Sequence, residues 1–422
     1  MISSTSKPAT LEAWLAYIEA LHPKSIAMGL DRVAKVANRL EIHPNFPIIT
    51  IAGTNGKGST CAMLEAIYVQ TGYRVGCYTS PHLLRYNERV RVNQQEIADD
   101  KLCEAFAAVE AARGDVALTY FEMGTLAAVW HFVNVNLDMA ILEVGMGGRL
   151  DAVNVFEPAC AIVTSIDLDH MEYLGDTREK IGFEKAGIYR GHKLAICGDE
   201  NPPKSVVDYA AKIGADLCLI KRDFTVEKTL QGWLYSTSSF ELALTTLALH
   251  GDFQLNNAAC AICAVRHLNE ILPVPQANIG AALRAVTLEG RFHQIGSNPD
   301  IIVDVAHNPQ AAQSLAHNLQ STPCAGRTLA VLAMLADKDI AGVIYALTPH
   351  ISAWYLADIH NVRGAKAIDL QNKLDKITTS KLFKNVTTAV QAACKDAAKN
   401  DRIVIFGSFY TVADAIEGLN FS

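Results

Sequence analysis

The sequence predicts an α/β protein in which a domain with a mostly parallel sheet precedes a smaller, Rossmann-like α/β domain. From residue 48 onward, short runs rich in β-branched residues alternate with longer helix-like runs, the order that builds parallel sheets covered by helices. A glycine-rich turn at residues 53–58 joins the first of these runs to a helix-like run. At residues 288–300, Gly, Ser, Asn and Pro cluster and the alternation then restarts. We therefore predict domains at residues 1–290 and 291–422.

The expected strands of the first domain are six apolar runs, at residues 48–52, 73–80, 138–144, 159–166, 193–197 and 216–220. Residues 11–40 precede them and are typical of one or two helices. Residues 222–250 alternate aromatic with Thr or Ser positions, which favours a β-rich excursion, and a helix is expected at residues 256–268. The strands of the second domain are expected within residues 301–309, 327–339, 352–360 and 402–409.

Composition and charge exclude several classes of protein. With 422 residues, 50% of them hydrophobic, the chain can bury a large interior in two or three domains. The net charge of -7 provides no field that gathers nucleic acid, so we expect no nucleic-acid partner. No apolar run reaches the ~20 residues of a membrane span, and the start, MISSTSKPAT, lacks the pattern of a signal peptide. The ten scattered cysteines are typical of a reduced, cytoplasmic protein.

The glycine-rich turn has the strand, turn and helix that a phosphate cradle requires. Its three glycines let backbone N–H groups point at an anion, and the helix that begins near Ser59 adds its positive dipole end. Lys57 would reach the β- and γ-phosphates, and the hydroxyl of Ser59 or Thr60 could bind Mg²⁺. The spacing departs from the standard GxxxxGK[ST] pattern, because Ile51 replaces the first glycine and Gly58 follows the lysine. The alternative is a plain turn between a strand and a helix.

Acidic side chains follow two further predicted strands. Glu143 lies where the run MAILEV meets a glycine-rich loop, and Asp167, Asp169 and His170 follow the run ACAIVTSI. Ligands of open α/β sheets bind at the carboxyl ends of the strands, where a carboxylate resembles the acid that holds Mg²⁺ in nucleotide-binding proteins. The alternatives are a solvated acid and a structural histidine.

A lysine follows this acidic cluster on the next predicted helix. Asp176 and Glu179 have the spacing of a capping box, and the helix that they open carries Lys185. A lysine on a helix is usually a solvated cation. Beside a magnesium site it would be repelled unless it contacted phosphate or had been converted to an anion.

Six motifs in order resemble the folylpolyglutamate synthase and dihydrofolate synthase branch of the Mur ligase superfamily. They are AGTNGKGS, TSPHLLRYNERV, EVGMGGRLDA, DLDHMEYLG, EKAGI and DVAHNPQAA. The resemblance spans nearly the whole chain and starts at GLDRV, residues 29–33. It implies an enzyme that uses ATP to join an amino acid to a carboxylate through an acyl phosphate.

The resemblance also implies how the nucleotide and metal are held. The phosphate loop, or P-loop, of the family matches Thr54, Asn55, Gly56, Lys57, Gly58, Ser59 and Thr60. Two magnesium sites are implied, with ligands that match Ser80, Glu143, His170 and Lys185. The lysine of EKAGI is typically carbamylated in the family, which would turn Lys185 into a carboxylate-like ligand. Asn257, Arg291 and Asp304 match the residues at the adenosine side, although Phe253 stands where the superfamily often has a histidine.

The substrate pockets follow from the same resemblance. The pterin-side segments of the family match Thr119, Tyr120, Phe121 and Glu122, and Leu150, Asp151 and Ala152. His307 and Ser408 lie in motifs that face the incoming glutamate, and Lys57, Lys185 and His307 are the expected catalytic residues. Arg149 and Asp151 would lie at the pterin end of the site, with a local Arg149–Asp151 ion pair as the alternative.

The expected activity is addition of L-glutamate both to dihydropteroate and to reduced folates, with ATP and Mg²⁺. The segments TYFEMGTLAA and GGRLDA resemble bifunctional bacterial members of the family more closely than single-activity ones. A single-activity folylpolyglutamate synthase is the first alternative, and a muramyl-peptide ligase and a non-catalytic P-loop switch are the others. We expect a monomer, as is usual in the family.

Overall fold

The computed structural model describes residues 8–23, 26–375 and 379–420, and the chain divides into two compact units. The first unit contains the chain up to Ala248 together with Leu255–Val286. The second contains Leu249–Gln254 and the chain from Thr287 onward. The predicted boundary at residue 290 assigned residues 249–254 to the first domain, whereas the structure groups them with the second unit. The resemblance implies that the first domain binds ATP and the pterin and that the second presents glutamate, and these roles stay predictions.

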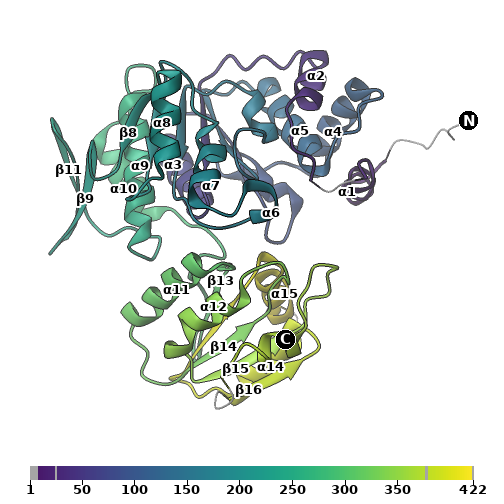
Figure 1. Cartoon of the computed structure of the whole chain (residues 1–422), viewed down its shortest axis with the longest axis vertical. Coiled ribbons are helices and arrows are strands. Elements are labelled where there is room, and N and C mark those ends of the chain that lie inside the picture. Colours follow the sequence, from purple (N-terminus) through teal and green to yellow (C-terminus); the bar gives the residue numbers. More distant parts are fainter. Residues whose placement is uncertain (1–7, 24–25, 376–378, 421–422) are drawn as a thin grey trace, which may run out of the picture. The chain divides into compact units, whose positions relative to one another are not determined.

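The first unit is built on an eight-stranded sheet with the order β4-β3-β2-β5-β1-β6-β7-β8. Figure 1 draws this unit with β8 and several of its helices labelled. Strands β2, β5, β1, β6, β7 and β8 are parallel, and β3 and β4 extend one edge in antiparallel pairing. The strands are β1 (Ile48–Ala52), β2 (Val75–Tyr78), β3 (Val90–Val92), β4 (Gln95–Glu96), β5 (Met139–Glu143), β6 (Cys160–Val163), β7 (Leu194–Cys197) and β8 (Asp216–Leu219). The central strands β1, β5 and β6 are buried along their whole length, as their continuous apolar runs predict.

Helices cover this sheet and bury its apolar residues. They are α1 (Leu11–Ala20), α2 (Asp31–Arg39), α3 (Lys57–Thr71), α4 (Asp99–Arg113), α5 (Tyr120–Asn134), α6 (Met171–Leu174), α7 (Arg178–Ala186), α8 (Lys204–Ile213), α9 (Phe253–His267) and α10 (Gln276–Ala285). One apolar core joins residues of α1, α2, α4, α5, α7 and α8 to β1, β5 and β6. Helix α3 packs against α10 as well as against β1, β2 and β5. Thr177 rather than Asp176 caps α7, by accepting a hydrogen bond from the Lys180 amide, so the predicted capping box is wrong.

A small antiparallel sheet follows the last strand of the large sheet. Its order is β11-β10-β9, with β9 (Phe224–Thr229), β10 (Gly232–Thr237) and β11 (Phe240–Leu244). This sheet is the β-rich excursion expected at residues 222–250. Trp233 and Tyr235 on β10 are buried, because alternate residues of a strand point to the same face.

The second unit contains a six-stranded sheet with the order β12-β13-β17-β14-β15-β16. All neighbours are parallel except β12 and β13. The strands are β12 (His293–Gly296), β13 (Asp300–Asp304), β14 (Thr328–Leu332), β15 (Ala353–Ala357), β16 (Ser380–Phe383) and β17 (Arg402–Phe406). The helices are α11 (Pro309–Ser321), α12 (Ile340–Leu347), α13 (Ala367–Gln371), α14 (Val386–Asp396) and α15 (Phe409–Asn420).

The structure confirms the predicted fold class. Every expected strand run contains a strand, and the eight-stranded and six-stranded sheets are mostly parallel with helices between their strands. The predicted helical stretch at residues 11–40 forms two helices, α1 and α2. Within the described ranges, no helix has the length and apolar character needed to cross a membrane.

Candidate active site

Four adjacent parallel strands bring the predicted motifs of the first unit to one edge of the sheet. Strands β2, β5, β1 and β6 are neighbours in this order, so their carboxyl ends lie side by side. The P-loop follows β1, Glu143 ends β5, Ser80 follows β2, and residues 164–170 follow β6. Open α/β sheets bind ligands at this edge, so the fold places these motifs where a nucleotide would bind.

The backbone of the P-loop requires glycine at two positions. Gly53 has φ +154° and Gly56 has φ +89°, conformations that residues with a side chain rarely adopt. A Cβ atom at Gly56 would lie 2.4 Å from Oδ1 of Asn257, and one at Gly53 would lie 1.9 Å from Oγ1 of Thr164. The predicted adenosine-side residue Asn257, on α9, therefore packs directly against the P-loop.

The first turn of α3 presents the lysine and the hydroxyls of the loop. Lys57 donates from Nζ to the carbonyl oxygens of Gly53 at 3.0 Å and Thr54 at 3.3 Å, so its ammonium group bends back over the loop. Thr60 is fully buried and donates its hydroxyl to the Gly56 carbonyl oxygen at 3.0 Å. This contact uses the Thr60 hydroxyl proton inside the helix, and Ser59 precedes Thr60 in the same first turn of α3.

Ser80 and Glu143, two predicted metal ligands, are in contact. The Ser80 amide donates to Oε2 of Glu143 at 3.0 Å, and the Glu143 side chain is buried at the end of β5. His170 precedes α6 in the left-handed conformation, with φ +50°, directly after Asp169. The chain therefore turns at His170, the predicted histidine ligand, before α6 begins.

Lys185 is buried on α7 and lies close to another cation. Burial and the charge of Lys57 lower the pKa of Lys185 to about 7, against the opposing effect of Asp169 and Asp151. A buried ammonium beside a second lysine is unfavourable, and a neutral amine is the form that can react with carbon dioxide to give a carbamate. The environment of Lys185 therefore fits the modified lysine that the resemblance implies.

The donor set fits a magnesium site. Glu143 and Ser80 supply oxygen atoms, which Mg²⁺ prefers, and a carbamate on Lys185 would add more. Across residues 8–23, 26–375 and 379–420, no three His, Cys, Asp or Glu side chains gather as a metal-binding group. The predicted metal site therefore needs Ser80 and a modified Lys185 as ligands in addition to Glu143 and His170.

The predicted pterin segment at residues 119–122 forms the start of α5. Thr119 accepts a hydrogen bond from the Glu122 amide, and Oε2 of Glu122 accepts one from the Thr119 amide at 2.7 Å, which makes a capping box. Oε1 of the buried Glu122 also accepts a hydrogen bond from Arg32 at 2.8 Å. Arg32 in turn donates to the Ala27 carbonyl oxygen at 2.6 Å. Glu122 thus holds the segment in place, and sequence reasoning missed Arg32 although it lies in GLDRV.

Aromatic side chains surround this segment. The ring of Phe121 lies over Gly145, where a Cβ atom would come within 2.6 Å of it, so the start of α5 packs on the glycine-rich loop after β5. The Arg89 guanidinium lies over the rings of Tyr86 and Tyr120, 5.1 and 5.6 Å from their centroids. Tyr86 and Arg89 were not predicted as site residues from the sequence, although TSPHLLRYNERV contains both.

Asp151 organises the loop at residues 145–155. Its carboxylate accepts hydrogen bonds from the amides of Met146 at 2.9 Å and Val153 at 3.0 Å, and its burial raises the pKa of Asp151 to about 7. Leu150 and Ala152 flank it, and the Leu150 carbonyl oxygen accepts a hydrogen bond from Gly29 at 3.4 Å. The segment at residues 150–152 is therefore tied to the start of the GLDRV motif.

Arg149 has a different partner from the one considered in the sequence. Its guanidinium pairs with Glu184 at 2.8 Å and lies 5.6 Å from the centroid of the Phe183 ring. The alternative of a local Arg149–Asp151 ion pair is therefore wrong. The contact instead fastens the glycine-rich loop to α7, next to Lys185.

Three predicted residues of the second unit, Asp304, His307 and Ser408, end or follow the neighbouring strands β13 and β17, and Arg291 precedes β12. Asp304 ends β13 and accepts hydrogen bonds from the amides of Phe292 and Ala306, both at 2.8 Å, and burial raises its pKa. The Arg291 guanidinium lies 5.2 Å from the centroid of the Phe409 ring. The carboxylate and the guanidinium thus each have partners within this unit.

The expected glutamate-facing residues lie at the same sheet edge of the second unit. His307 contacts the Val305 carbonyl oxygen through Nδ1 at 3.0 Å, just ahead of α11. Ser408 follows β17, is buried, and contacts the Thr411 hydroxyl at 2.7 Å. Phe253, at the start of α9, belongs to the second unit, whereas Asn257 of the same helix belongs to the first.

Comparison with known proteins places the chain. The Mur ligase middle domain matches residues 51–265, and the Mur ligase glutamate ligase domain matches residues 290–409. The chain is 44% identical over 419 residues to the Escherichia coli protein named dihydrofolate synthase/folylpolyglutamate synthase, covering 99% of this chain and 97% of that protein. The chain belongs to the Mur ligase family, in its dihydrofolate synthase/folylpolyglutamate synthase branch.

Solved structures of this Mur ligase branch share the fold over their full length. The structure of E. coli FolC in complex with DHPP and ADP matches with a TM-score of 0.94 at 43% identity, covering 99% of each chain. A bifunctional folylpolyglutamate synthase/dihydrofolate synthase with Mn, AMPPNP and L-glutamate bound matches with a TM-score of 0.92 at 43% identity, covering 99% of this chain and all of the other. Both matches include both units.

Proposed function

We propose that this Mur ligase is an ATP-dependent enzyme that adds L-glutamate to dihydropteroate and to reduced folates. One observation carries the proposal: one sheet edge of the first unit presents Lys57 of the P-loop and the Ser80–Glu143 contact, and the buried Lys185 of α7 lies close enough to Lys57 for the two charges to interact. Full-length similarity to relatives named for both activities supports the same conclusion.

The chemistry explains why such a site needs ATP. A carboxylate resists attack by an amine, because its leaving group would be an oxide. Transfer of the γ-phosphoryl group of ATP to a carboxylate oxygen gives an acyl phosphate and ADP. The glutamate amine then attacks the carbonyl carbon, loses a proton and expels inorganic phosphate, which leaves the new amide.

Residues of the first unit would bind the nucleotide phosphates and the metal. Lys57 would turn from the loop carbonyl oxygens toward the phosphates and offset charge on the transferred group. Ser80, Glu143, His170 and a carbamylated Lys185 would hold the two magnesium ions. When bound, these ions neutralise phosphate charge.

The acid substrate would bind against the start of α5 and the loop after β5. Phe121 packs on Gly145, and both segments are tied to the chain around residues 27–32 by Arg32 and Gly29. An aromatic surface beside backbone amide groups and the Asp151 carboxylate suits a flat, polar pterin ring. We assign Thr119, Tyr120, Leu150 and Ala152 to the same pocket.

The remaining predicted residues are assigned to the nucleotide and the amino acid. We assign Asn257, Arg291 and Asp304 to the adenosine part of ATP, and His307 and Ser408 to the incoming glutamate. Asp304 supports this assignment, because a buried carboxylate at a strand end can accept hydrogen bonds from ribose hydroxyls. We also propose a monomer, testable by light scattering, in the cytoplasm, where ten free cysteines stay reduced.

The test is an ATP turnover assay with purified protein, Mg²⁺ and one omission at a time. We expect phosphate release only when both a folate-type acid and L-glutamate are present. Turnover that needs neither would indicate a P-loop switch, and turnover with a UDP-linked muramyl acid would indicate a muramyl-peptide ligase. Either result would contradict the proposed function.

A further inference from the structure

A short segment after β6, residues 164–167, is hydrogen-bonded to the start of the P-loop. The Thr54 amide donates to the Ser165 carbonyl oxygen at 2.7 Å, and the Asn55 amide donates to Oγ of Ser165 at 3.1 Å. The Asp167 amide donates to the Thr54 hydroxyl at 3.0 Å, and the Thr164 hydroxyl donates to the Asn55 carbonyl oxygen at 2.6 Å. Residues 164, 165 and 167 thus hold the start of the P-loop, and the same segment continues to His170.

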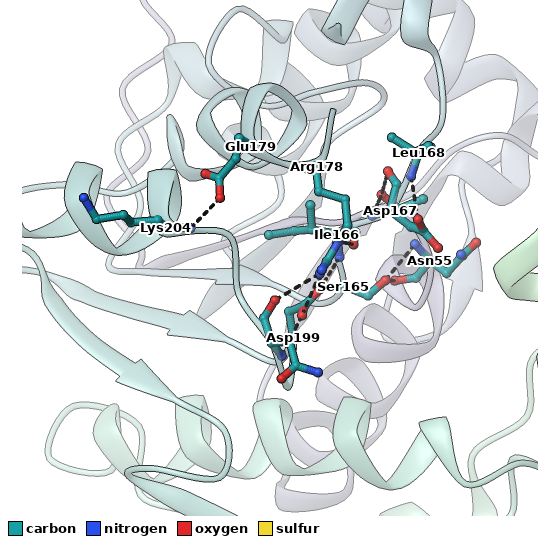
Figure 2. Close-up of polar contacts among 11 residues, drawn as sticks. Asn55, Ser165, Ile166, Asp167, Leu168, Arg178, Glu179, Asp199 and Lys204 are labelled. Carbon is teal, nitrogen blue, oxygen red and sulfur yellow. Dashed lines mark hydrogen bonds and ion pairs between the residues drawn. The ribbon is translucent and has the colours of Figure 1, made fainter. Parts of the chain in front are cut away.

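The residue between these contacts, Ile166, is held from the other side. Its amide donates to Oδ2 of Asp199 at 2.8 Å, and its carbonyl oxygen accepts from Nε of Arg178 at 2.8 Å. Nη2 of Arg178 pairs with both oxygens of Asp199, at 3.0 and 2.9 Å. Figure 2 shows this arrangement, with the P-loop residue Asn55 on one side of the segment and Arg178 and Asp199 on the other.

We define the clamp as Arg178 and Asp199. The Asp199 side chain is only 8% exposed, whereas the Arg178 side chain is 41% exposed, so the carboxylate is the shielded half of a charge-assisted contact. The Asn201 amide also donates to Oδ1 of Asp199, at 2.9 Å. Arg178 is the first residue of α7, and Asp199 follows β7, so the clamp connects two elements that lie far from the P-loop in the sequence.

We propose that Arg178 and Asp199 are positioning residues for nucleotide binding. They fix both polar groups of the Ile166 backbone, and the neighbouring residues on either side then hold Thr54 and Asn55. Release of Ile166 would let the segment and the P-loop shift together, along with the loop that carries His170. The proposal rests on the proposed function only in taking the P-loop as the site of ATP.

The competing interpretation is that the clamp only fastens α7 to the sheet. Neighbouring contacts on α7 have this simpler character. Glu179 accepts hydrogen bonds from the amides of Lys204 and Ser205, which joins α7 to α8 (Figure 2). Lys180 pairs with Asp176 at 2.8 Å on the exposed surface. Neither contact touches the segment that supports the P-loop, so Asp176 offers a matched control.

The first experiment measures MgADP binding by calorimetry for the wild type and for Asp199→Asn, Arg178→Lys and Asp176→Asn. We expect Asp199→Asn to raise the Kd at least tenfold. Arg178→Lys keeps the charge but cannot reach Ile166 and Asp199 together with a planar group, so we expect a rise of at least threefold. Asp176→Asn should change the Kd less than twofold. Unchanged Kd values in folded clamp variants, with only a lower Tm, would overturn the proposal.

A second measurement keeps the inference testable without nucleotide. Hydrogen exchange should show faster exchange of the amides of Thr54, Asn55 and Asp167 in Arg178→Lys than in Asp176→Asn. Equal exchange in the two variants would overturn the proposal even if Asp199→Asn fails to fold. A wild type that binds MgADP but ligates no glutamate would contradict the proposed function alone, because both clamp measurements are independent of turnover.

Discussion

At the scale of single residues, the site is organised around two lysines with opposite requirements. Lys57 needs its positive charge, because it is expected to face phosphate. Lys185 is buried beside it, and this proximity helps to lower the pKa of Lys185 to about 7. One cation thus makes the charged form of the other costly, which favours a modified lysine at position 185.

The first prediction concerns Lys57. Lys57→Ala should abolish turnover, because an oriented cation at the transferred phosphoryl group is worth several kcal/mol, on the order of 10²–10³ in kcat. The fold should remain intact, since the Lys57 ammonium donates to carbonyl oxygens of its own loop and the side chain is only partly buried. Steady-state kinetics measure the loss of turnover, and circular dichroism checks that the fold is intact. Near-normal turnover in the variant would contradict the P-loop assignment.

The second prediction concerns carbamylation of Lys185. Lys185→Ala should lose activity, and added acetate or formate should restore part of it by supplying the missing oxygen ligand. Lys180→Ala, on the same helix but exposed, should need no rescue. A high-resolution map with magnesium bound provides an independent check. An unmodified amine at Lys185 in that map would count against the role.

Sequence reasoning found the motifs but not all of the contacts that position them. Glycines, strand ends and charged residues can be predicted from the sequence, because each has a local reason to lie in a turn or at a sheet edge. The partners of Arg149 and Glu122 could not be predicted, because Glu184 lies 35 residues from Arg149 and Arg32 lies 90 residues from Glu122. Such pairings depend on how helices pack, which a local pattern does not encode.

At the scale of elements, the buried strands could be predicted from the sequence and the short strands at the sheet edge could not. The parallel strands were expected because continuous apolar runs need both faces covered. Strands β3 and β4 were not, since they contain only three and two residues and carry Arg91, Gln95 and Glu96. Their register depends on pairing with β2 at the sheet edge, and no apolar run marks it.

The third prediction concerns the start of strands β14 and β17. Asp401 accepts hydrogen bonds from the Arg327 amide and guanidinium, both at 2.7 Å, and from the Ala398 amide at 2.9 Å. The Arg327 contact, followed by the backbone contacts, lowers the pKa of Asp401 to about 2. Asp401→Asn should therefore lower the Tm at pH 7, by roughly 3–6 °C.

The pH dependence of this effect has a definite sign. The folded-state pKa lies below the ordinary value of 3.8, so the stabilisation is present above about pH 4 and is lost as the pH falls toward 2. The difference in Tm between wild type and Asp401→Asn should narrow at pH 3. Calorimetry at both pH values checks this. Asp208→Asn, which removes an exposed pair with Lys204, is the control and should change the Tm little. An equal difference at pH 7 and pH 3 would contradict the assignment.

At the scale of the whole molecule, the chain enters the second unit twice. Residues 249–254 belong to that unit because His250 contacts the Phe292 ring, with centroids 5.4 Å apart, and Asp252 pairs with His317 at 3.3 Å. The chain then returns to the first unit within α9. The sequence places a boundary near residue 290 through its Gly, Ser, Asn and Pro cluster, but the earlier crossing lies at the start of a helix and has no such cluster.

The last prediction is that one acid pocket serves both reactions. Dihydropteroate and reduced folates share the pterin ring, and the start of α5 and the loop of Asp151 pack together through Phe121 and Gly145. Purified protein with ATP, Mg²⁺ and glutamate should therefore form product from dihydropteroate and from a reduced folate monoglutamate. Product from the folate alone would reject bifunctionality.

Substitution at Asp151 tests whether the pocket is shared. Because both of its oxygens accept backbone hydrogen bonds, Asp151→Ala should disturb the loop as well as the pocket. Asp151→Asn keeps the shape and one acceptor oxygen and loses one of the two backbone hydrogen bonds, so it should disturb the loop less than Asp151→Ala. In both variants we expect the two activities to fall by the same factor, tenfold or more, while the Kd for MgADP stays within threefold. A loss of only one activity would contradict the shared pocket, because both substrates are expected to place the same pterin ring against Asp151.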